Sequence, residues 1–492
     1  MGNMGNIGSS MSRTKSIFFD TLMLDRSFRR IAIATATILL TTAFSLPASA
    51  TENTSADLTS GRQVDDIDRV DSLLEAEGKI LFGNGPEDQA DLKLSCRYQY
   101  DERLLHSAPI TVKAESDDAT PREDADAARL AVRHYRHLEG KLGEGERQAK
   151  IGVRPERMMV GIETDSEGVT VFSPLGPLMA DELDTFDTPA NTLLWDRLLP
   201  GKEMKIGESW THDDRLVAAI LHLEAIASNN LTSTLKSVDE RHAQIEMSGN
   251  IEGADDGISN TVEVTAKYRF DLQTKRIDWL ALLIRQKRGI SRVGDGLDVT
   301  LRLQTQVTPI ETSDELTDAS LTDRALRPTE EQKLISHQSG DSKWTIEHDR
   351  SWSAVMGEAG RTVLRFIDRG EFAVQCVAAT MPTIKPEDLP QLDQFQKQIE
   401  GKLGKYFGQF VSAAEKVTPS GLQIYEVAAI GQIDQVEVHW IYYLVSDPYG
   451  RQMILAMTME SERYEKYENL GDPIAESVRF PARIRTSSRP SE

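Results

Sequence analysis

Nine histidines are spread over the chain, and two of them have a spacing that suits metal ligation. His134 and His137 lie three residues apart, which would place both rings on one face of a helix. The intervening residues supply no acidic partner of the H-E-x-x-H kind. On a helical wheel the pair also lies away from the apolar stripe, so we interpret both as solvent-facing and predict no metal site.

Other motifs of catalysis are missing from the sequence. Asp255-Asp256-Gly257 lacks the alternating acids of a calcium loop, and Gly294-Asp295-Gly296 is a turn between strands and not a dinucleotide fingerprint. Neighbouring acids such as Asp181 and Glu182 have the chemistry of a general acid and base. With 78 carboxylates in the chain, such pairs arise by chance, so we predict no catalytic residue and no cofactor.

The chain has two cysteines, Cys96 and Cys376. Cys376 lies in an apolar run at 372–377, which is typical of a buried thiol and not of an activated nucleophile. An exported protein would allow a disulfide between the two, and the alternative is two buried thiols that pack as small hydrophobic residues. The sequence leaves both possibilities open, while the lack of C-x-x-C excludes a zinc ribbon or a redox motif.

A cluster of aromatic residues near the C-terminus is the one candidate binding surface for a ligand or partner. Tyrosine and tryptophan are frequent binding anchors, and a nearby arginine would add a charge. The alternative is core packing, because two of the aromatic residues share one face of a predicted strand. The candidate residues are Trp440, Tyr442, Tyr443, Tyr449 and Arg451.

Length and charge limit the class of protein. The chain has 492 residues, of which 39% are hydrophobic and 27% are charged. These values fit a globular protein with more than one domain, because single cores rarely grow past about 250–300 residues. The formal charge of −22 excludes nucleic acid as a partner, since that affinity depends on Lys and Arg.

The first 50 residues have the features of a secretory signal peptide. Basic residues including Arg29-Arg30 precede an uncharged run at 31–46, and Ala48-Ser49-Ala50 follows it. As a helix the run would span about 24 Å, short of a roughly 30 Å hydrocarbon core, which disfavours an uncleaved anchor. We predict cleavage after Ala50 and a periplasmic or extracellular protein without a stable membrane anchor. The initiating methionine (Met11 and Met23 are alternatives) and the Sec or twin-arginine route stay open.

Residues 51–86 are polar and acidic, and we predict a mobile segment there. An antiparallel β-rich domain with one or two helices is then expected over 87–311. A capping box at Thr120–Glu123 predicts a helix that runs to about residue 142. Alternating apolar residues predict a hairpin at 158–172, and a helix is expected after Asp213-Asp214.

Five long runs at 231–308 alternate apolar and polar residues, which is typical of an antiparallel sheet with one face on a core. Residues 312–340 are expected to form a polar linker with a small capping box from Thr329 to Gln332. A second α/β domain is expected over 341–482, with strands around a helix at 388–414, and a frayed tail over 483–492. We therefore predict an α+β fold of two domains.

The second domain resembles the PsbP-like family, the α/β/α sandwich of photosystem extrinsic proteins and of small Ran-binding proteins of the Mog type. The likeness covers 341–482. The residues that carry it are Trp344, Trp352, Arg365 before the Gly370 turn, the helix at 388–414, Gly421, the run Trp440–Tyr443, Asp447 and Arg451. The resemblance implies a sandwich with an antiparallel sheet and, because the family is diverse and mostly non-enzymatic, a binding or accessory role. No catalytic residue carries over.

The first domain resembles the broad class of exported domains with a curved antiparallel sheet, such as lipoprotein carriers, without a motif for one family. We expect an exported non-enzymatic protein that binds a protein partner as an interaction or accessory scaffold protein of the cell envelope. The alternative is a carrier of a small hydrophobic, lipid-like ligand in the first sheet, and a hydrolase is the third possibility. An open cavity at Val262, Val264, Leu301 and Leu303 would favour the carrier, and a helix covering them would favour the scaffold. Oligomeric state stays open.

Overall fold

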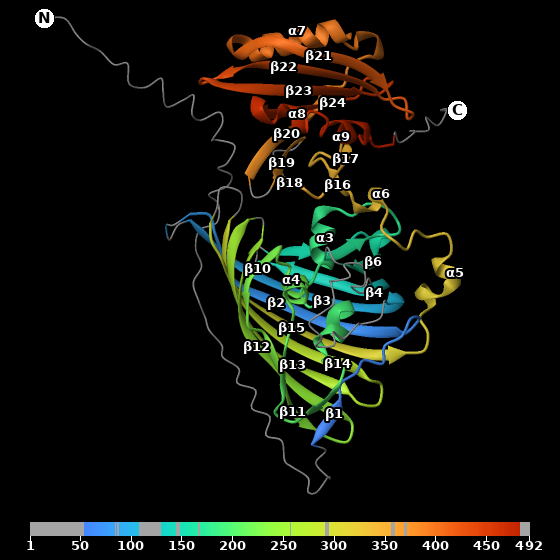
Figure 1. The fold of residues 1–492 in the computed structure, drawn as a ribbon. Coiled ribbons are helices and arrows are strands. Elements are labelled where there is room, and N and C mark those ends of the chain that lie inside the picture. Colours follow the sequence, from blue (N-terminus) through green and yellow to red (C-terminus); the bar gives the residue numbers. More distant parts are fainter. Residues whose placement is uncertain are drawn as a thin grey trace, which may run out of the picture. The chain divides into compact units, whose positions relative to one another are not determined.

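The computed structural model describes residues 54–83, 85, 88–107, 129–143, 148–165, 168–255, 257–290, 295–355, 360–368 and 371–482 (Figure 1). The predicted signal peptide, the capping box at Thr120–Glu123 and the tail over 483–492 lie outside these residues. Within the described ranges, no helix is long and apolar enough to cross a membrane.

The first sheet has thirteen strands, and all of its pairings are antiparallel. It curves strongly, as Figure 1 shows. Along β13, buried residues alternate with exposed ones, so one face is packed and the other is wet. In spatial order the main path is β7 (Val169–Phe172), β6 (Met159–Thr164), β4 (Arg129–Leu142), β3 (Gln89–Ser107), β2 (Ile67–Leu81), β15 (Gly296–Ile310), β14 (Arg276–Arg288), β13 (Ile258–Asp271), β12 (His242–Asp255), β11 (Thr232–Val238) and β9 (Ser209–Thr211). Beside it, β10 (Ala225–Asn229) pairs with β12, and β5 (Ala149–Ile151) pairs with β4.

The prediction of a mobile segment over 51–86 is wrong. β1 (Ser55–Asp57) pairs with β8 (Glu203–Lys205), and β2 lies between β3 and β15. Along β2 the buried Val70, Leu74 and Ala76 alternate with charged residues on the exposed face. The acidic composition of that exposed face concealed the alternation.

The helix predicted up to residue 142 is also wrong, because residues 129–142 form strand β4. The first five residues of β4 are all buried, so the strand shows no two-residue alternation there. Part of the predicted linker covers the second face of β4. Leu316 of η5 (Asp314–Leu316) and Leu321 of α5 (Asp318–Leu321) pack there against Val132 and Met159. The linker also contains α6 (Glu330–Lys333), which begins with the predicted capping box, and β16 (Ile335–Gln338).

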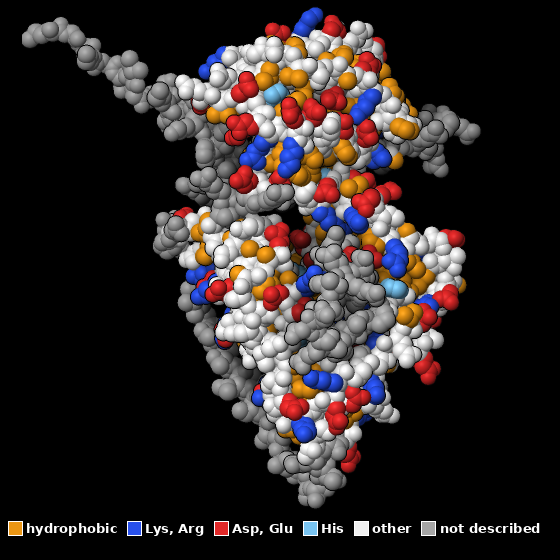
Figure 2. All heavy atoms as spheres, in the orientation of Figure 1, with side chains coloured by type: hydrophobic (Ala, Val, Ile, Leu, Met, Phe, Trp, Pro, Cys, Tyr) orange, Lys and Arg blue, Asp and Glu red, His pale blue; other side chains and the backbone are white. Residues whose placement is uncertain are grey.

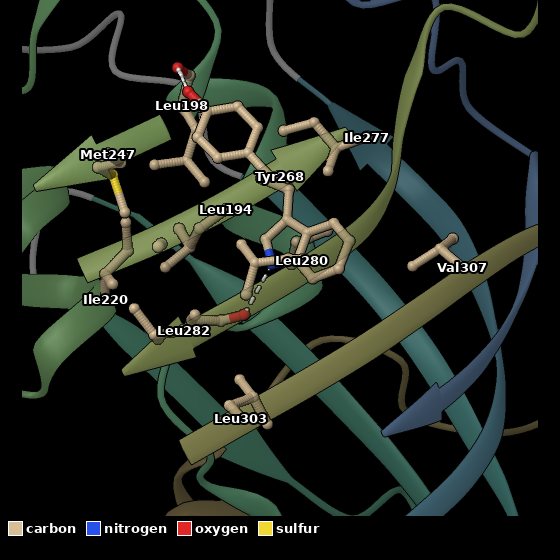
Figure 3. Packing of buried hydrophobic residues seen from close by; sticks show 14 of the residues in the cluster. Leu194, Leu198, Ile220, Met247, Tyr268, Ile277, Leu280, Leu282, Leu303 and Val307 are labelled. Carbon is tan, nitrogen blue, oxygen red and sulfur yellow. Dashed lines mark hydrogen bonds between the residues drawn. The ribbon is translucent and has the colours of Figure 1, made fainter. Parts of the chain in front are cut away.

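The packed face of the first sheet is covered by the chain itself. We call residues 180–198 together with 214–221 the plug; they contain α3 (Ala180–Phe186), η4 (Thr192–Leu198) and α4 (Asp214–Leu221). Figure 3 shows Leu194, Leu198 and Ile220 of the plug against Tyr268 and Leu282 of the sheet. Val262, Val264 and Leu303 are buried in the same cluster, and Leu301 packs against it.

The second large sheet has seven antiparallel strands. Its spatial order is β18 (Trp352–Val355), β19 (Arg361–Asp368), β20 (Glu371–Met381), β24 (Gln452–Glu460), β23 (Val436–Ser446), β22 (Gln423–Ile433) and β21 (Phe407–Val417). α7 (Leu392–Leu403) packs on one face through Phe395 and Ile399. α8 (Tyr464–Tyr467), α9 (Asp472–Glu476) and β17 (Thr345–His348), which pairs with β16, contribute to the core on the opposite face. The chain is thus rich in antiparallel sheet, as predicted.

The predicted helix at 388–414 is too long. α7 ends at Leu403 because Gly404 adopts a left-handed conformation, with φ of 53° and its N–H donating to the carbonyl of Glu400. A short 3-10 turn, η7 (Gly404–Tyr406), follows, and strand β21 begins at Phe407. Phe407 and Phe410 continue the helical spacing of the apolar stripe by coincidence, and both pack against the same core from the strand.

Truncation of the plug should destabilise the fold. Leu194→Ala removes a fully buried side chain and should lower the free energy of unfolding by about 2–5 kcal/mol. Leu175→Ala, at a leucine that is 40% exposed, is the matched control and should change it by about 0.5 kcal/mol or less. Urea unfolding measures both, and equal effects would contradict the packing described.

Candidate functional site

Three of the predicted surface residues are core residues. Trp440 and Tyr442, on one face of β23, pack beneath α7 in the cluster that contains Phe395. Tyr443 points to the opposite face, is fully buried and donates its hydroxyl to Asp472 Oδ1 over 2.9 Å. The core-packing alternative is therefore the one that the structure shows for these three side chains.

The other two predicted residues lie at the turn between β23 and β24. Gly450 N donates to the carbonyl of Asp447 over 3.1 Å, which closes a turn over residues 447–450. Arg451 Nε donates to Asp447 Oδ2 over 2.6 Å, and its guanidinium lies over the ring of Phe480. Tyr449 is 54% exposed. Arg451 thus fastens the C-terminal segment, and the five residues do not form a common surface.

Strand β21 is an open edge that the sequence prediction missed, because it assigned these residues to a helix. The described edge strands of the two large sheets are otherwise short: β7 and β18 have four residues each and β9 has three, whereas β21 has eleven. Val411 and Val417 on β21 are 45% and 67% exposed. An edge strand presents unpaired N–H and C=O groups, and proteins usually shorten or shield such edges.

The last six residues of β21, 412–417, pair with β22 in an uninterrupted register, after two bulges near Phe407 and Phe410. Lys416 Nζ donates to Glu476 Oε1 over 2.9 Å on one face. Gln423 Nε2 donates to Glu415 Oε1 over 2.9 Å. These contacts hold the strand in place, so its free edge is ordered before any partner arrives.

A cluster of buried charges joins the plug to the first sheet. Glu102 of β3 is fully buried and accepts from Arg62 Nη2 and from Arg133 Nε, both at 2.6 Å. Arg133 also donates to Thr192 Oγ1 at the start of η4 over 2.8 Å. Arg129 Nη1 donates to Asp196 Oδ2 in η4 over 2.5 Å. We call Arg62, Glu102, Arg129, Arg133, Thr192 and Asp196 the clamp.

Glu102 and Arg133, the two central residues of the clamp, are ionised in spite of their burial. Burial strongly disfavours the ionised form of Glu102, but Arg133 and Arg62 outweigh it and hold its pKa at about 2, below the ordinary 4.5. Burial opposes the charge on Arg133 as well, and its neighbours Tyr100 and Glu102 raise its pKa above the usual range. Each charged residue of the clamp has an opposite charge in contact, so the clamp fixes the plug to the sheet.

One group of residues resembles a metal site in its composition. His242, Asp271 and Asp278 place ligand atoms within 4.8 Å of one another. However, Arg241 Nε donates to Asp271 Oδ2 over 2.9 Å, and Arg269 binds both oxygens of Asp278 over 2.8 and 2.7 Å. A cation would meet two guanidinium groups there, so the donor set does not fit a metal.

The two cysteines are free and buried, in separate cores. Cys96 packs in the first sheet domain and Cys376 in the second sheet. Burial raises the pKa of the Cys376 thiol to about 12, which leaves it in the unreactive protonated form. Of the two alternatives from the sequence, the structure shows buried thiols.

No protein-family model and no curated protein matches the chain. Solved structures with partial likeness include the PsbP protein CyanoP from Synechocystis sp. PCC 6803, at 17% identity and a TM-score of 0.25, over 30% of this chain and 93% of that one. A putative regulator of unknown function, PA94 from Pseudomonas aeruginosa, has 11% identity and a TM-score of 0.20 over 31% and 99% of the two chains. The immunity protein TplEi of a type VI secretion system from the same species has 11% identity and a TM-score of 0.19, over 47% and 72%. With TM-scores this low, these likenesses carry no argument about the fold or the function of this chain.

Removal of the Glu102 charge should destabilise the protein strongly. Glu102→Gln leaves the buried Arg133 without its counter-charge and removes one of the two carboxylates paired with Arg62, the other being Asp68, which should cost about 3–5 kcal/mol. Glu263→Gln breaks the exposed pair with Arg285 and should cost about 0–1 kcal/mol. Chemical denaturation at neutral pH measures both variants, and a loss for Glu102→Gln as small as for the control would contradict the clamp.

The low pKa of Glu102 also predicts that the folded protein loses stability in acid. Because the pKa of Glu102 is lower in the folded state, its contribution to stability is complete above the unfolded value near 4.5 and is lost as pH falls toward 2. Wild type should therefore lose more stability across this window than Glu102→Gln loses. Unfolding free energies measured from pH 5 down to 2 test this, and parallel curves for the two proteins would be the contrary result.

Proposed function

We propose that this chain is an exported, non-enzymatic interaction or accessory scaffold protein of the cell envelope, which binds a partner protein along strand β21. The observation that carries the proposal is the long, ordered and exposed edge of β21. An extended segment of a partner can add to such an edge through backbone hydrogen bonds, with side-chain contacts giving specificity. The PsbP-like sandwich that the sequence resembles also implies an accessory role.

The partner segment should be extended and carry net positive charge. The chain has a formal charge of −22, and acidic side chains are spread among basic ones on the face seen in Figure 2. Such a field favours cationic partners and speeds their association. At the edge itself, Val411 and Val417 offer apolar contacts to the incoming strand.

The alternative of a hydrophobic-ligand carrier receives less support. Its predicted lining residues Val262, Val264 and Leu303 are buried against the sheet's own core, and the plug occupies the face where a lipid would lie. A carrier would require the plug to leave, which would expose the clamp's charges without their partners. The hydrolase alternative stays an untested prediction.

Charges placed on the β21 edge should weaken partner binding. The double variant Val411→Lys with Val417→Lys adds two cations beside the free edge, where lysine is a known guard against strand pairing. Val436→Lys, at a valine that is 47% exposed at the start of β23, adds the same side chain away from that edge and is the control. We expect the double variant to retain a co-purifying envelope partner at least about tenfold more weakly.

Hydrogen exchange, measured on the complex of this protein with its co-purifying partner, shows which strand the partner binds. Partner binding should slow exchange of amides within 412–417 in wild type and in Val436→Lys. Equal retention by all three proteins, or protection confined to other strands, would contradict the proposal. Thermal unfolding of each variant shows whether the fold is kept.

A further inference from the structure

A cavity of about 340 Å³ lies beside the plug, between the β6–β7 hairpin and helix α4. Its volume is in the range of small-molecule sites. It does not involve the clamp or the β21 edge. Its described lining includes Asp187, Arg197, Arg215, Ala219, His222 and Glu224.

One stripe of α4 forms a wall of the cavity. Arg215, Ala218, Ala219 and His222 follow one another at helical spacing and so share a face, while the opposite face, with Leu216, is buried in the core. From Arg215 to His222 the helix rises about 10 Å. The wall therefore has a charged group at one end, a titratable ring at the other and two small apolar side chains between them.

The end near Arg215 is basic. Arg197 lies 3.7 Å from Asp213, measured from Nη2 to Oδ1, and Asp213 caps the N-terminus of α4 by accepting from Leu216 N. Arg197 is thus at the same end of the helix as Arg215. Asp213 and Asp214 offset part of this charge, and the guanidinium groups of Arg197 and Arg215 with the N-terminal end of α4 are the positive groups that an anionic ligand group would meet there.

The opposite end favours a cation. Asp187 ends α3, and its Oδ1 lies 3.5 Å from Nε2 of His222, which ends α4. Glu224 follows two residues later. The carbonyl ends of both helices add negative partial charge. His222 Nε2 is buried and has no hydrogen-bond partner among the described residues.

The backbone at this end is held in an unusual conformation. His222 has a φ of 54° and Ala190 has a φ of 50°, in the left-handed region that non-glycine residues rarely adopt. Ala190 N donates to the carbonyl of Ile220 over 3.0 Å, which ties the end of α4 to the segment after Asp187. The conformation of His222 closes the C-terminus of α4 as a left-handed cap, with its N–H donating to the carbonyl of Ala218.

We infer that this cavity binds a small zwitterionic ligand, a short peptide with free termini of about three residues. Its carboxylate lies at Arg197 and Arg215, its ammonium group at Asp187 and Glu224, and its apolar middle over Ala218 and Ala219. An extended chain advances about 3.3–3.6 Å per residue, so three residues match the length of the wall. A dianionic ligand such as a phosphate ester would meet carboxylates at one end, and a lipid would meet charges at both.

Calorimetry on the full chain tests the chemistry of the ligand. Trialanine should bind, and trialanine blocked by N-terminal acetylation and C-terminal amidation should bind at least about tenfold more weakly, because both charged contacts are lost. Absence of heat with trialanine at millimolar concentration, or equal binding of the blocked peptide, would overturn the inference.

Two variants test the position. Ala219→Leu fills the middle of the cavity and should abolish binding, whereas Ala227→Leu, at an exposed alanine of β10, should leave it unchanged. Asp187→Asn should weaken trialanine about tenfold but not N-acetyl-trialanine, which lacks the ammonium group. Binding that persists in Ala219→Leu, or a loss for Asp187→Asn that is equal with both peptides, would contradict the site. The β21 double variant should bind trialanine like wild type, so this inference and the proposed function can fail separately.

Discussion

A buried carboxylate shared by two arginines holds the plug against the first sheet. Glu102, Arg62 and Arg133 lie between the sheet and the plug, and Arg129 with Asp196 adds a second pair. Breaking one buried partner of such a pair costs far more than the intact pair contributes, because the remaining charge stays in a low-dielectric site. The apolar contacts of the plug supply most of the favourable free energy of burial. The charged residues of the clamp fix the position of the plug on the sheet.

This arrangement decides where binding can occur. With the packed face of the first sheet occupied, a ligand of appreciable size has access to the margin of the plug and to the sheet edges. The cavity beside α4 lies at that margin, and its ends are charged because helix termini and their capping residues meet there. The β21 edge lies in the other sheet and offers backbone groups instead of a pocket. The two surfaces therefore suit different partners.

Local pattern in the sequence predicted the elements whose surroundings are simple. Strands β11 to β15 have one wet face, so their alternation shows in the residues; α4 was found from its N-cap at Asp213 and its apolar face. β2 and β4 were missed because the first is highly charged on its exposed face and the second is covered on both faces where it begins. β21 was missed because two phenylalanines continued a helical spacing past Gly404. The clamp joins residues far apart in the chain, so no spacing shows it. The stripe from Arg215 to His222, in contrast, follows from helical spacing once the helix is predicted.

The plug is part of the folded core, so it should not open separately from the first sheet. Native-state hydrogen exchange of the buried amides in η4, compared with those at the centre of β13, measures this most directly. We expect both groups of amides to exchange with the same free energy of opening, close to that of global unfolding. Exchange of the η4 amides through a local opening of much lower free energy, while the β13 amides stay protected, would contradict this expectation.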